Sequence, residues 1–234
     1  MRPFIASAAL LALLAASAPA ADPEPPVVPP KKGKSEKIEL FDGKSLDGWD
    51  GHKNLWSVQN GVIVGKNTKE VKVSTYLLTK KSFSDFHLAF SAKLVESEMH
   101  SGVALWGEID ATKGDPFAYK GHLVMFPAGW GLWDLYGRAS LKVDAKPALK
   151  VGKPHDWNDM EIYAQGNRIR LVVNGMLVVD WRDPEPNTIM EGPIGLQLHK
   201  NVVPQEIHFK GLVLNTFPDD KKLEGKKVGD KVGP

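Results

Sequence analysis

The stretch WNDMEIYAQGNRIRLVVNGMLVVDW, residues 157–181, decides the fold class of this chain. Apolar and polar residues alternate over 160–164 and again over 169–173, which is the period-two pattern of half-buried strands. Gln165-Gly166-Asn167 separates the two runs, and Asn174-Gly175 follows the second one. Asn-Gly suits a type I′ turn, because both central residues of that turn take a positive φ. The stretch therefore predicts a three-stranded antiparallel meander.

Strand patterns recur along the rest of the chain, and no long window keeps apolar residues at helical spacing. A second Asn-Gly pair, Asn60-Gly61, lies between apolar runs, and residues 86–94 alternate regularly. Further candidate strands are Gly102–Trp106, Gly121–Phe126, Ile194–His199 and Ile207–Leu214. Since each sheet must bury one face against another layer, we expect an all-β fold, a two-sheet antiparallel β-sandwich of the jelly-roll type.

The two ends of the chain differ from this core in composition. Residues 1–20 combine Arg2, an apolar run and a small-residue site ending at Ala20, which predicts a signal peptide cleaved after Ala20 and a secreted or periplasmic protein. A membrane anchor is the less favoured alternative, since the apolar run is shorter than the ~20 residues that span a bilayer. Residues 21–37 read as a solvated Pro/Lys-rich linker, 38–216 as the β-sandwich domain, and 217–234 as a disordered charged tail.

Composition narrows the classes of partner. The chain has no cysteine, which excludes disulfides and thiolate metal sites. Its 30 Lys and Arg nearly balance 28 Asp and Glu, and no basic stripe interleaved with aromatic residues is visible, so nucleic acid is not an expected partner. The oligomeric state stays open.

Several motifs occur in one order along the core. They are LFDGKSLDGW (40–49), WSV with NGVI (56–63), LLT (77–79), Ser101-Gly102-Val103, Trp157-Asn158, Asn174-Gly175 and IGLQ with His199 (194–199). Together they resemble the bacterial 3-keto-disaccharide hydrolase family, the 3-keto-glucoside 1,2-lyase/3-keto-2-hydroxy-glucal hydratase domains. The resemblance implies a concanavalin A-like lectin/glucanase sandwich that cleaves a 3-keto glycoside by C2 proton abstraction, elimination and hydration. A carbohydrate, an oxidised glycoside or glycan, is the partner it implies.

Three polar positions of that family are changed here. Trp106 stands where the family usually has Arg, while Leu123 and Met125 stand where it has Glu and Gln. These changes leave open a second interpretation, a non-catalytic, lectin-like carbohydrate-binding module on the same fold. A structural envelope protein is a third.

The chemistry of a 3-keto sugar selects the catalytic candidates. Its acidified C2 proton needs a base, and the enolate oxygen and leaving group need donors. Histidine suits these roles because its ordinary pKa is about 6.5. We take His199, with Gln197 on the same strand face, together with His100 and His122 as candidates. Convergence of the three histidines would favour an enzyme or a metal site, and scattered histidines beside exposed aromatic rings would favour binding alone.

The substrate-binding candidates are Gln197, Arg138, Trp106, Trp130, Tyr136, Glu108 and Asp110. Trp130 lies between glycines, which predicts an exposed loop tip whose ring stacks on a sugar, whereas core packing is the alternative for Trp133 and Tyr136.

Glu108-Ile109-Asp110 resembles the start of a retaining β-glucanase signature, but Thr112 and Lys113 stand where the second carboxylate would follow. Retention needs that second group about 5 Å from the nucleophile, so ordinary glucanase action is not expected. Three interpretations of Glu108 and Asp110 stay open: they act as a base, they bind a cation, or they are solvated loop carboxylates. The sequence requires no cofactor and is compatible with a divalent cation.

Overall fold

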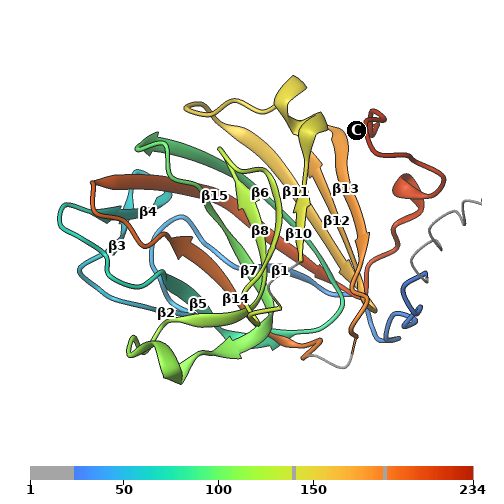
Figure 1. Cartoon of the computed structure of the whole chain (residues 1–234), viewed down its shortest axis with the longest axis horizontal. Coiled ribbons are helices and arrows are strands. Elements are labelled where there is room, and N and C mark those ends of the chain that lie inside the picture. The colour runs from blue at the N-terminus through green and yellow to red at the C-terminus, as the bar shows by residue number, and fades with distance from the viewer. Residues whose placement is uncertain (1–23, 139–140, 187–188, 234) are drawn as a thin grey trace, which may run out of the picture.

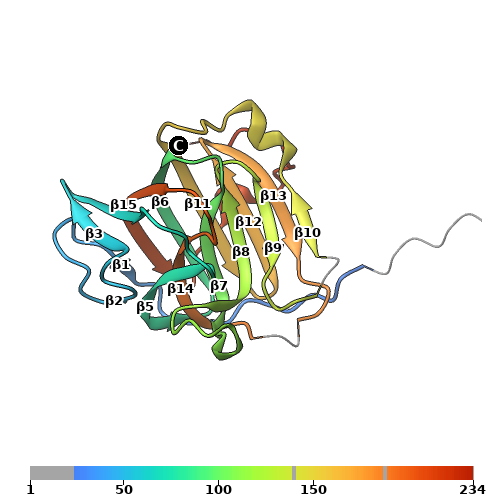
Figure 2. The same cartoon turned by 60° about the vertical axis from the view of Figure 1, so that its left-hand side comes forward.

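Two antiparallel sheets packed face to face form the molecule, as the alternating pattern predicts (Figures 1 and 2). The structure is a computed structural model that describes residues 24–138, 141–186 and 189–233, so the expected signal peptide lies outside the described residues. The eight-stranded sheet has the order β13-β12-β11-β6-β15-β4-β3, with β1 also paired to β15. The seven-stranded sheet has the order β10-β9-β8-β7-β14-β5-β2.

The strands of the eight-stranded sheet are β1 (Lys37–Glu39), β3 (Trp56–Gln59), β4 (Val62–Asn67), β6 (Phe86–Glu96), β11 (Asn158–Gln165), β12 (Arg168–Val173), β13 (Met176–Arg182) and β15 (Gln205–Thr216). Those of the seven-stranded sheet are β2 (Trp49–Asp50), β5 (Thr75–Phe83), β7 (Ser101–Ile109), β8 (Tyr119–Phe126), β9 (Gly131–Asp134), β10 (Lys142–Asp144) and β14 (Gly192–Leu198). Short 3₁₀ turns are η1 (Ala111–Lys113), η2 (Lys146–Lys150) and η3 (Lys221–Leu223). In the described ranges, no helix has the length and apolar character needed to cross a membrane.

The predicted meander is confirmed as β11, β12 and β13. Met160 pairs with Val173 and Ile162 with Leu171, so the alternating apolar set faces the opposite sheet. Asn174 and Gly175 both have positive φ, 46° and 74°, as a type I′ turn requires.

The core fills the space between the two sheets with side chains from both inner faces. Phe90 of β6 and Phe209 of β15 meet Phe126 of β8, with ring centroids 5.6 and 5.9 Å from that of Phe126. All three rings are at most 4% exposed. Burying this apolar area is what holds the sheets together.

The expectation of a disordered C-terminal tail is wrong. Leu223 and Val232 are buried against an outer cluster formed by Tyr163, Val172 and Leu177. The backbone of the tail also bonds the β12–β13 hairpin, since the N–H groups of residues 229 and 232 donate to the carbonyls of residues 177 and 175. The β12–β13 register shifts between Leu171 and Val172, which leaves Val178 as the extra residue of a bulge in β13. Leu177 therefore lies beside Val172 on the outer face, and the tail covers both.

Residues 24–36 have no regular secondary structure and none of them is buried, as expected of a solvated linker, but they also make specific contacts with the sandwich. The backbone N–H of Val28 donates to Asn167 Oδ1 at 3.0 Å, and Asn167 Nδ2 donates to the Pro26 carbonyl at 2.7 Å. The contact is close, because a Cβ added to Gly166 would lie 2.0 Å from the Val28 carbonyl oxygen. A Pro-rich segment has no internal hydrogen bonds, so its extended backbone is free to bond side chains of the sandwich.

Candidate functional site

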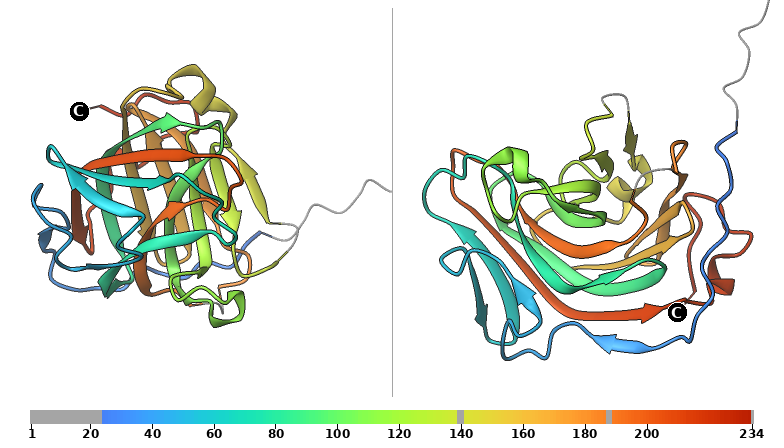
Figure 3. Two further views of the ribbon diagram at one scale, coloured as in Figure 1. Left: turned by 90° about the vertical axis from the view of Figure 1, so that its left-hand side faces the viewer. Right: turned by 90° about the horizontal axis from the view of Figure 1, so that it is seen from below.

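Both sheets curve in the same sense, and the seven-stranded sheet lies on the inner side of the curve (Figure 3, right). The strand register places one row of residues across its outer face. The row runs through Leu78, Gly195, Ala104, Leu123 and Trp133. Registered partners project to the same side of a sheet, so these residues share the concave face.

The centre of the concave face is apolar. Tyr76, Ala104, Leu123 and Met125 belong to one cluster there, and each is at most 4% exposed. Trp133 is the exception, with 44% of its surface exposed. The changed positions Leu123 and Met125 thus pack against apolar neighbours and offer no polar atoms to a ligand.

A hairpin extension between β7 and β8 folds over this face. Tyr119 at its base donates its hydroxyl to the Pro193 carbonyl of β14 at 2.7 Å, and the Phe117 carbonyl accepts from Tyr76 N of β5 at 3.1 Å. At the tip, Asp115 accepts a hydrogen bond from the Thr75 hydroxyl at 3.1 Å. The extension, residues 110–118, therefore spans from β8 to β5 across the sheet.

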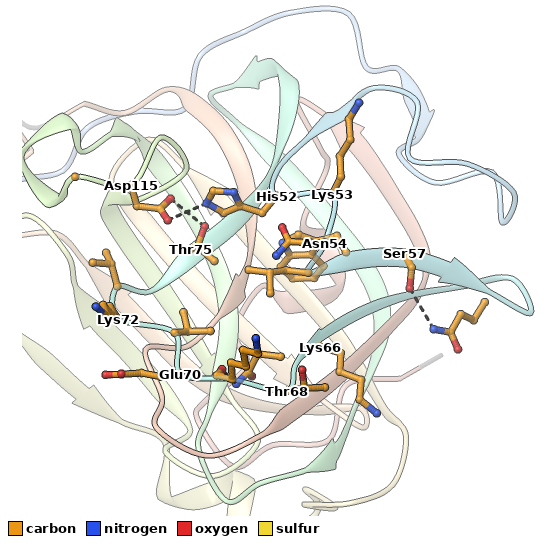
Figure 4. A pocket seen from close by; sticks show the side chains of 18 residues that line it. His52, Lys53, Asn54, Ser57, Lys66, Thr68, Glu70, Lys72, Thr75 and Asp115 are labelled. Atoms are coloured by element: carbon orange, nitrogen blue, oxygen red, sulfur yellow. Dashed lines mark hydrogen bonds and ion pairs between the residues drawn. The ribbon is translucent and has the colours of Figure 1, made fainter.

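Two cavities flank this hairpin extension. The concave cavity, about 410 Å³, is lined by Tyr76, Tyr119, Trp133, Lys72, Lys113 and Lys200, among others. The rim cavity, about 880 Å³, lies on the other side, where β3, β4 and the segment before β5 meet. Figure 4 shows Lys53, Lys66 and Lys72 around the rim cavity, with His52 and Thr75 both joined to Asp115.

His100 and His199 lie together at the edge of the concave face, with ring centroids 4.5 Å apart. Burial, with the nearby His199 and Lys142, lowers the pKa of His100 to about 4. Burial also lowers the pKa of His199. Both imidazoles are therefore neutral near pH 7.

The surroundings of His199 select one tautomer. Its Nδ1 lies against the Lys200 carbonyl oxygen, which can only accept, so Nδ1 carries the proton and Nε2 is left as an acceptor. Gln197 lies on the same face, donates from Nε2 to the Tyr76 hydroxyl at 3.1 Å, and has no partner for Oε1 within the described residues.

His122 does not join this pair. It is 2% exposed and points between the sheets, because it precedes Leu123 and successive strand residues face opposite sides. Its Nε2 lies 3.0 Å from Asp183 Oδ2, and the rings of Tyr136 and Trp181 pack around it. Of the three candidate histidines, His100 and His199 therefore lie together and His122 lies apart from them.

Arg138 belongs to the same buried network. It forms ion pairs with Asp134 and Asp183, each at 2.8 Å, and its side chain is 13% exposed. Burial alone would raise the pKa of Asp183, but hydrogen bonds from His122 and Arg138 outweigh that effect and hold this pKa well below its ordinary range. Arg138 is thus committed to two carboxylates and is not free to bind a sugar.

The aromatic candidates are placed differently from the prediction. Trp106 is 1% exposed and donates Nε1 to the Ser84 carbonyl, because a bulge in β7 and a φ of 49° turn it into the core. Trp130 is 6% exposed and packs over Gly152. The hydroxyl of Tyr136 lies against the Trp106 carbonyl. The prediction of exposed stacking rings is therefore wrong for Trp106 and Trp130, while Trp133, for which core packing was the alternative, is exposed.

The carboxylate pair lies outside the concave cavity. Glu108 forms an exposed ion pair with Lys120 at 2.7 Å. Asp110 accepts hydrogen bonds from the backbone and hydroxyl of Thr112, which lower its pKa and cap η1. In the described part of the chain, no group of three or more His, Asp or Glu side chains is arranged to hold a metal ion.

Sequence reasoning missed the His52–Asp115 contact, 2.9 Å between Nε2 and Oδ2, and the lysines of the two cavities. No sequence signal could have found them, because they come from separate loops that meet only in the fold.

The comparisons agree with this architecture. The family model described as 3-keto-alpha-glucoside-1,2-lyase-like domain matches residues 36–215. No curated protein sequence matches the chain. A candidate glycosyl hydrolase from Parabacteroides distasonis is 22% identical with a TM-score of 0.57, covering 78% of this chain and 100% of that one.

Two further structures share the fold. The carbohydrate-binding module CBM66 from Bacillus subtilis is 17% identical with a TM-score of 0.54, covering 72% of this chain and 96% of that one. The β-glucanase of Bacillus licheniformis is 14% identical with a TM-score of 0.54, covering 80% and 100%. At these identities the likeness shows the concanavalin A-like jelly-roll fold.

Proposed function

Because the chain belongs to the family of 3-keto-alpha-glucoside-1,2-lyase-like domains, we propose that it binds a carbohydrate in the concave cavity of its seven-stranded sheet. The observation that carries this proposal is Trp133, which lines the cavity and is 44% exposed in a face that is otherwise buried. An exposed indole stacks on the C–H face of a sugar and loses little conformational entropy on binding. Polar atoms of Ser74, Lys113 and Lys200 lie around the same cavity and are available to sugar hydroxyls.

The test uses Trp133 and titration calorimetry against a panel of oligosaccharides. We expect Trp133→Ala to weaken binding roughly 10-fold or more, and Trp133→Phe, which keeps a ring, to weaken it much less. Leu149→Ala is the control, because Leu149 is 74% exposed on η2 and lines neither cavity. Unchanged affinity in Trp133→Ala, with an unchanged melting temperature, would remove the concave cavity as the binding site.

A second candidate function is cleavage of a 3-keto glycoside, with His199 as the base. The neutral His100–His199 pair favours it, since Nε2 of His199 is an acceptor able to take the C2 proton. The C–H electron pair then forms the enolate, and its collapse expels the C1 oxygen substituent, which takes up the proton held by His199; water then adds across the C1–C2 double bond. Against it stand the apolar Leu123 and Met125, which supply no donor for the enolate oxygen.

Turnover of a 3-keto glucoside separates the two functions. If the domain is catalytic, His199→Ala abolishes turnover while His155→Ala does not, because His155 lies on the surface, paired with Glu98. Sugar binding without turnover in the unmodified protein would leave the binding function and discard the lyase.

The secreted or periplasmic location is part of the proposal and rests on the sequence pattern of residues 1–20. Determination of the N-terminus of the protein recovered from the envelope or medium tests it. A mature chain that begins after Ala20 is expected, and an intact Met1 on the exported protein would contradict cleavage.

A further inference from the structure

The concave and rim cavities adjoin one another beside the hairpin extension. Lys72 and Val73 line both cavities. On the facing segment, Lys113 lines the concave cavity, and the next residues, Gly114 and Asp115, line the rim cavity. One elongated ligand therefore meets both cavities by crossing residues 72–73.

Lysines dominate the charge along this path. Those that line one cavity or the other are Lys53, Lys66, Lys69, Lys72, Lys113 and Lys200. Within the described residues only Lys66 has a carboxylate partner, Glu206, at 2.6 Å. The chain as a whole is nearly balanced, with 30 basic and 28 acidic residues, so this excess of positive charge is local.

The carboxylates on the same path are fewer than the lysines, and two of the three make contacts of their own. Asp115 is held by His52 and by the Thr75 hydroxyl, and Asp134 by Arg138. Glu70 is the remaining lining carboxylate, so the lysines outnumber the carboxylates along the path. Unpaired ammonium groups lining a concave path favour a ligand with repeated negative charges.

From these observations we infer that the ligand is an anionic polysaccharide, carrying uronate carboxylates or sulfate esters, which lies across both cavities. This inference rests on the proposed function, because Trp133 supplies the sugar contact at one end of the path. The lysines then bind the charged substituents of successive sugar units. The His52–Asp115–Thr75 contacts fix the tip of the hairpin extension and so keep the two cavities aligned.

The experiment compares polygalacturonate, dextran sulfate and neutral dextran by calorimetry at low salt and at about 0.15 M salt. We expect at least one of the anionic polymers to bind at least 10-fold more tightly than dextran, with affinity falling as salt rises. The preferred anion distinguishes a carboxylate from a sulfate ligand. The test variant is Lys72→Gln combined with Lys113→Gln, which should weaken anionic binding roughly 5-fold, since each exposed ion pair contributes a factor of about 1.5 to 5.

The matched control is Lys146→Gln with Lys150→Gln, which removes the same charge from η2, away from both cavities. An equal loss of affinity for the anionic polymers in both double variants would overturn the inference and indicate a long-range charge effect. Equal binding of dextran and the anionic polymers would overturn the inference and leave the proposed function standing. Binding of none of these polymers, or of any sugar in the wider panel, would remove the proposed function itself. Binding of duplex DNA as tight as the best anionic polymer, and unaffected by Trp133→Ala, would overturn the inference in favour of an unselective polyanion surface.

Discussion

Replacing Leu223 by Ala tests whether the C-terminal segment is part of the folded domain. Leu223 is 3% exposed and packs in the outer cluster with Tyr163, Val172 and Leu177. Leu-to-Ala changes in buried sites cost about 2–5 kcal/mol, and the lower end applies here because the cluster is small and lies at the surface. We therefore expect a loss of about 2 kcal/mol in the free energy of unfolding, or about 4–8 °C in Tm.

The loss in Tm has a ceiling, because the tail is able to detach before the sandwich unfolds. If docking of the tail stabilises the domain by less than about 2 kcal/mol, the Tm falls only by the amount that corresponds to that smaller free energy. The tail of the variant then opens locally more often, and 2 kcal/mol corresponds to an increase on the order of 30-fold in the ratio of open to docked tail. The assay therefore combines thermal unfolding, followed by circular dichroism, with the rate of proteolysis inside residues 217–234.

Leu149→Ala makes the same chemical change at a side chain that is 74% exposed. A change of less than about 0.5 kcal/mol is expected there. If Leu223→Ala matched Leu149→Ala in both Tm and cleavage rate, the packing of the tail on the β11–β13 face would be refuted.

Three further predictions concern the buried network, the histidine pair and the N-terminal segment. Asp183→Asn should lower the free energy of unfolding in urea by about 3–5 kcal/mol, because it leaves the buried charge of Arg138 with one carboxylate fewer. The control, Asp144→Asn on the exposed strand β10, should lower it by less than about 1 kcal/mol. A small effect of Asp183→Asn would contradict the network. The folded-state pKa of His100, about 4, lies below its ordinary value of 6.5, so on acidification the unfolded chain binds the proton first and stability falls from pH 6.5 towards 4. His100→Gln should flatten this part of the stability profile, and parallel profiles would argue against the shift. Gly166→Ala should free residues 24–36, since its Cβ would meet the Val28 carbonyl, and faster hydrogen exchange there measures the release; unchanged exchange would contradict the contact.

The strands could be predicted because their signals are local. The alternation over residues 160–173 and the pairs Asn60-Gly61 and Asn174-Gly175 each act within a few neighbouring residues. The two-sheet arrangement followed from these strands, since each sheet must bury one face, and the family resemblance agreed with it; the fold bears it out.

The placement of side chains was less predictable where a bulge shifts the register. The irregularity between Leu105 and Glu108 turns Trp106 inward, although simple alternation from Gly102 would put it on the concave face. A single bulge inverts the expected facing of a residue, and the sequence carries no clear mark of it. His122 is a different case, because alternation itself places it opposite Leu123.

The docking of the C-terminal tail and the contacts of residues 24–36 were missed because composition does not record sparse contacts. Leu223 and Val232 are the only buried apolar residues of the described tail, which is too few to form a pattern. They nevertheless pack on the apolar outer face of β11, β12 and β13. The lysines of the two cavities were missed for a related reason. Lys53, Lys113 and Lys200 are far apart in the sequence, so their local excess of charge exists only in the folded protein.

The position of β15 has a consequence for how the domain folds. This strand, Gln205–Thr216, lies in the interior of the eight-stranded sheet and pairs with β6, β4 and β1, all from the first half of the chain. Until residues 205–216 are available, β6 and β4 each keep an open edge, and pairings of such long sequence separation form slowly. Open edges in a partly folded chain also invite intermolecular pairing. The sheet therefore cannot close before β15 has been synthesised, and the domain reaches its folded state only once residues 205–216 have been released.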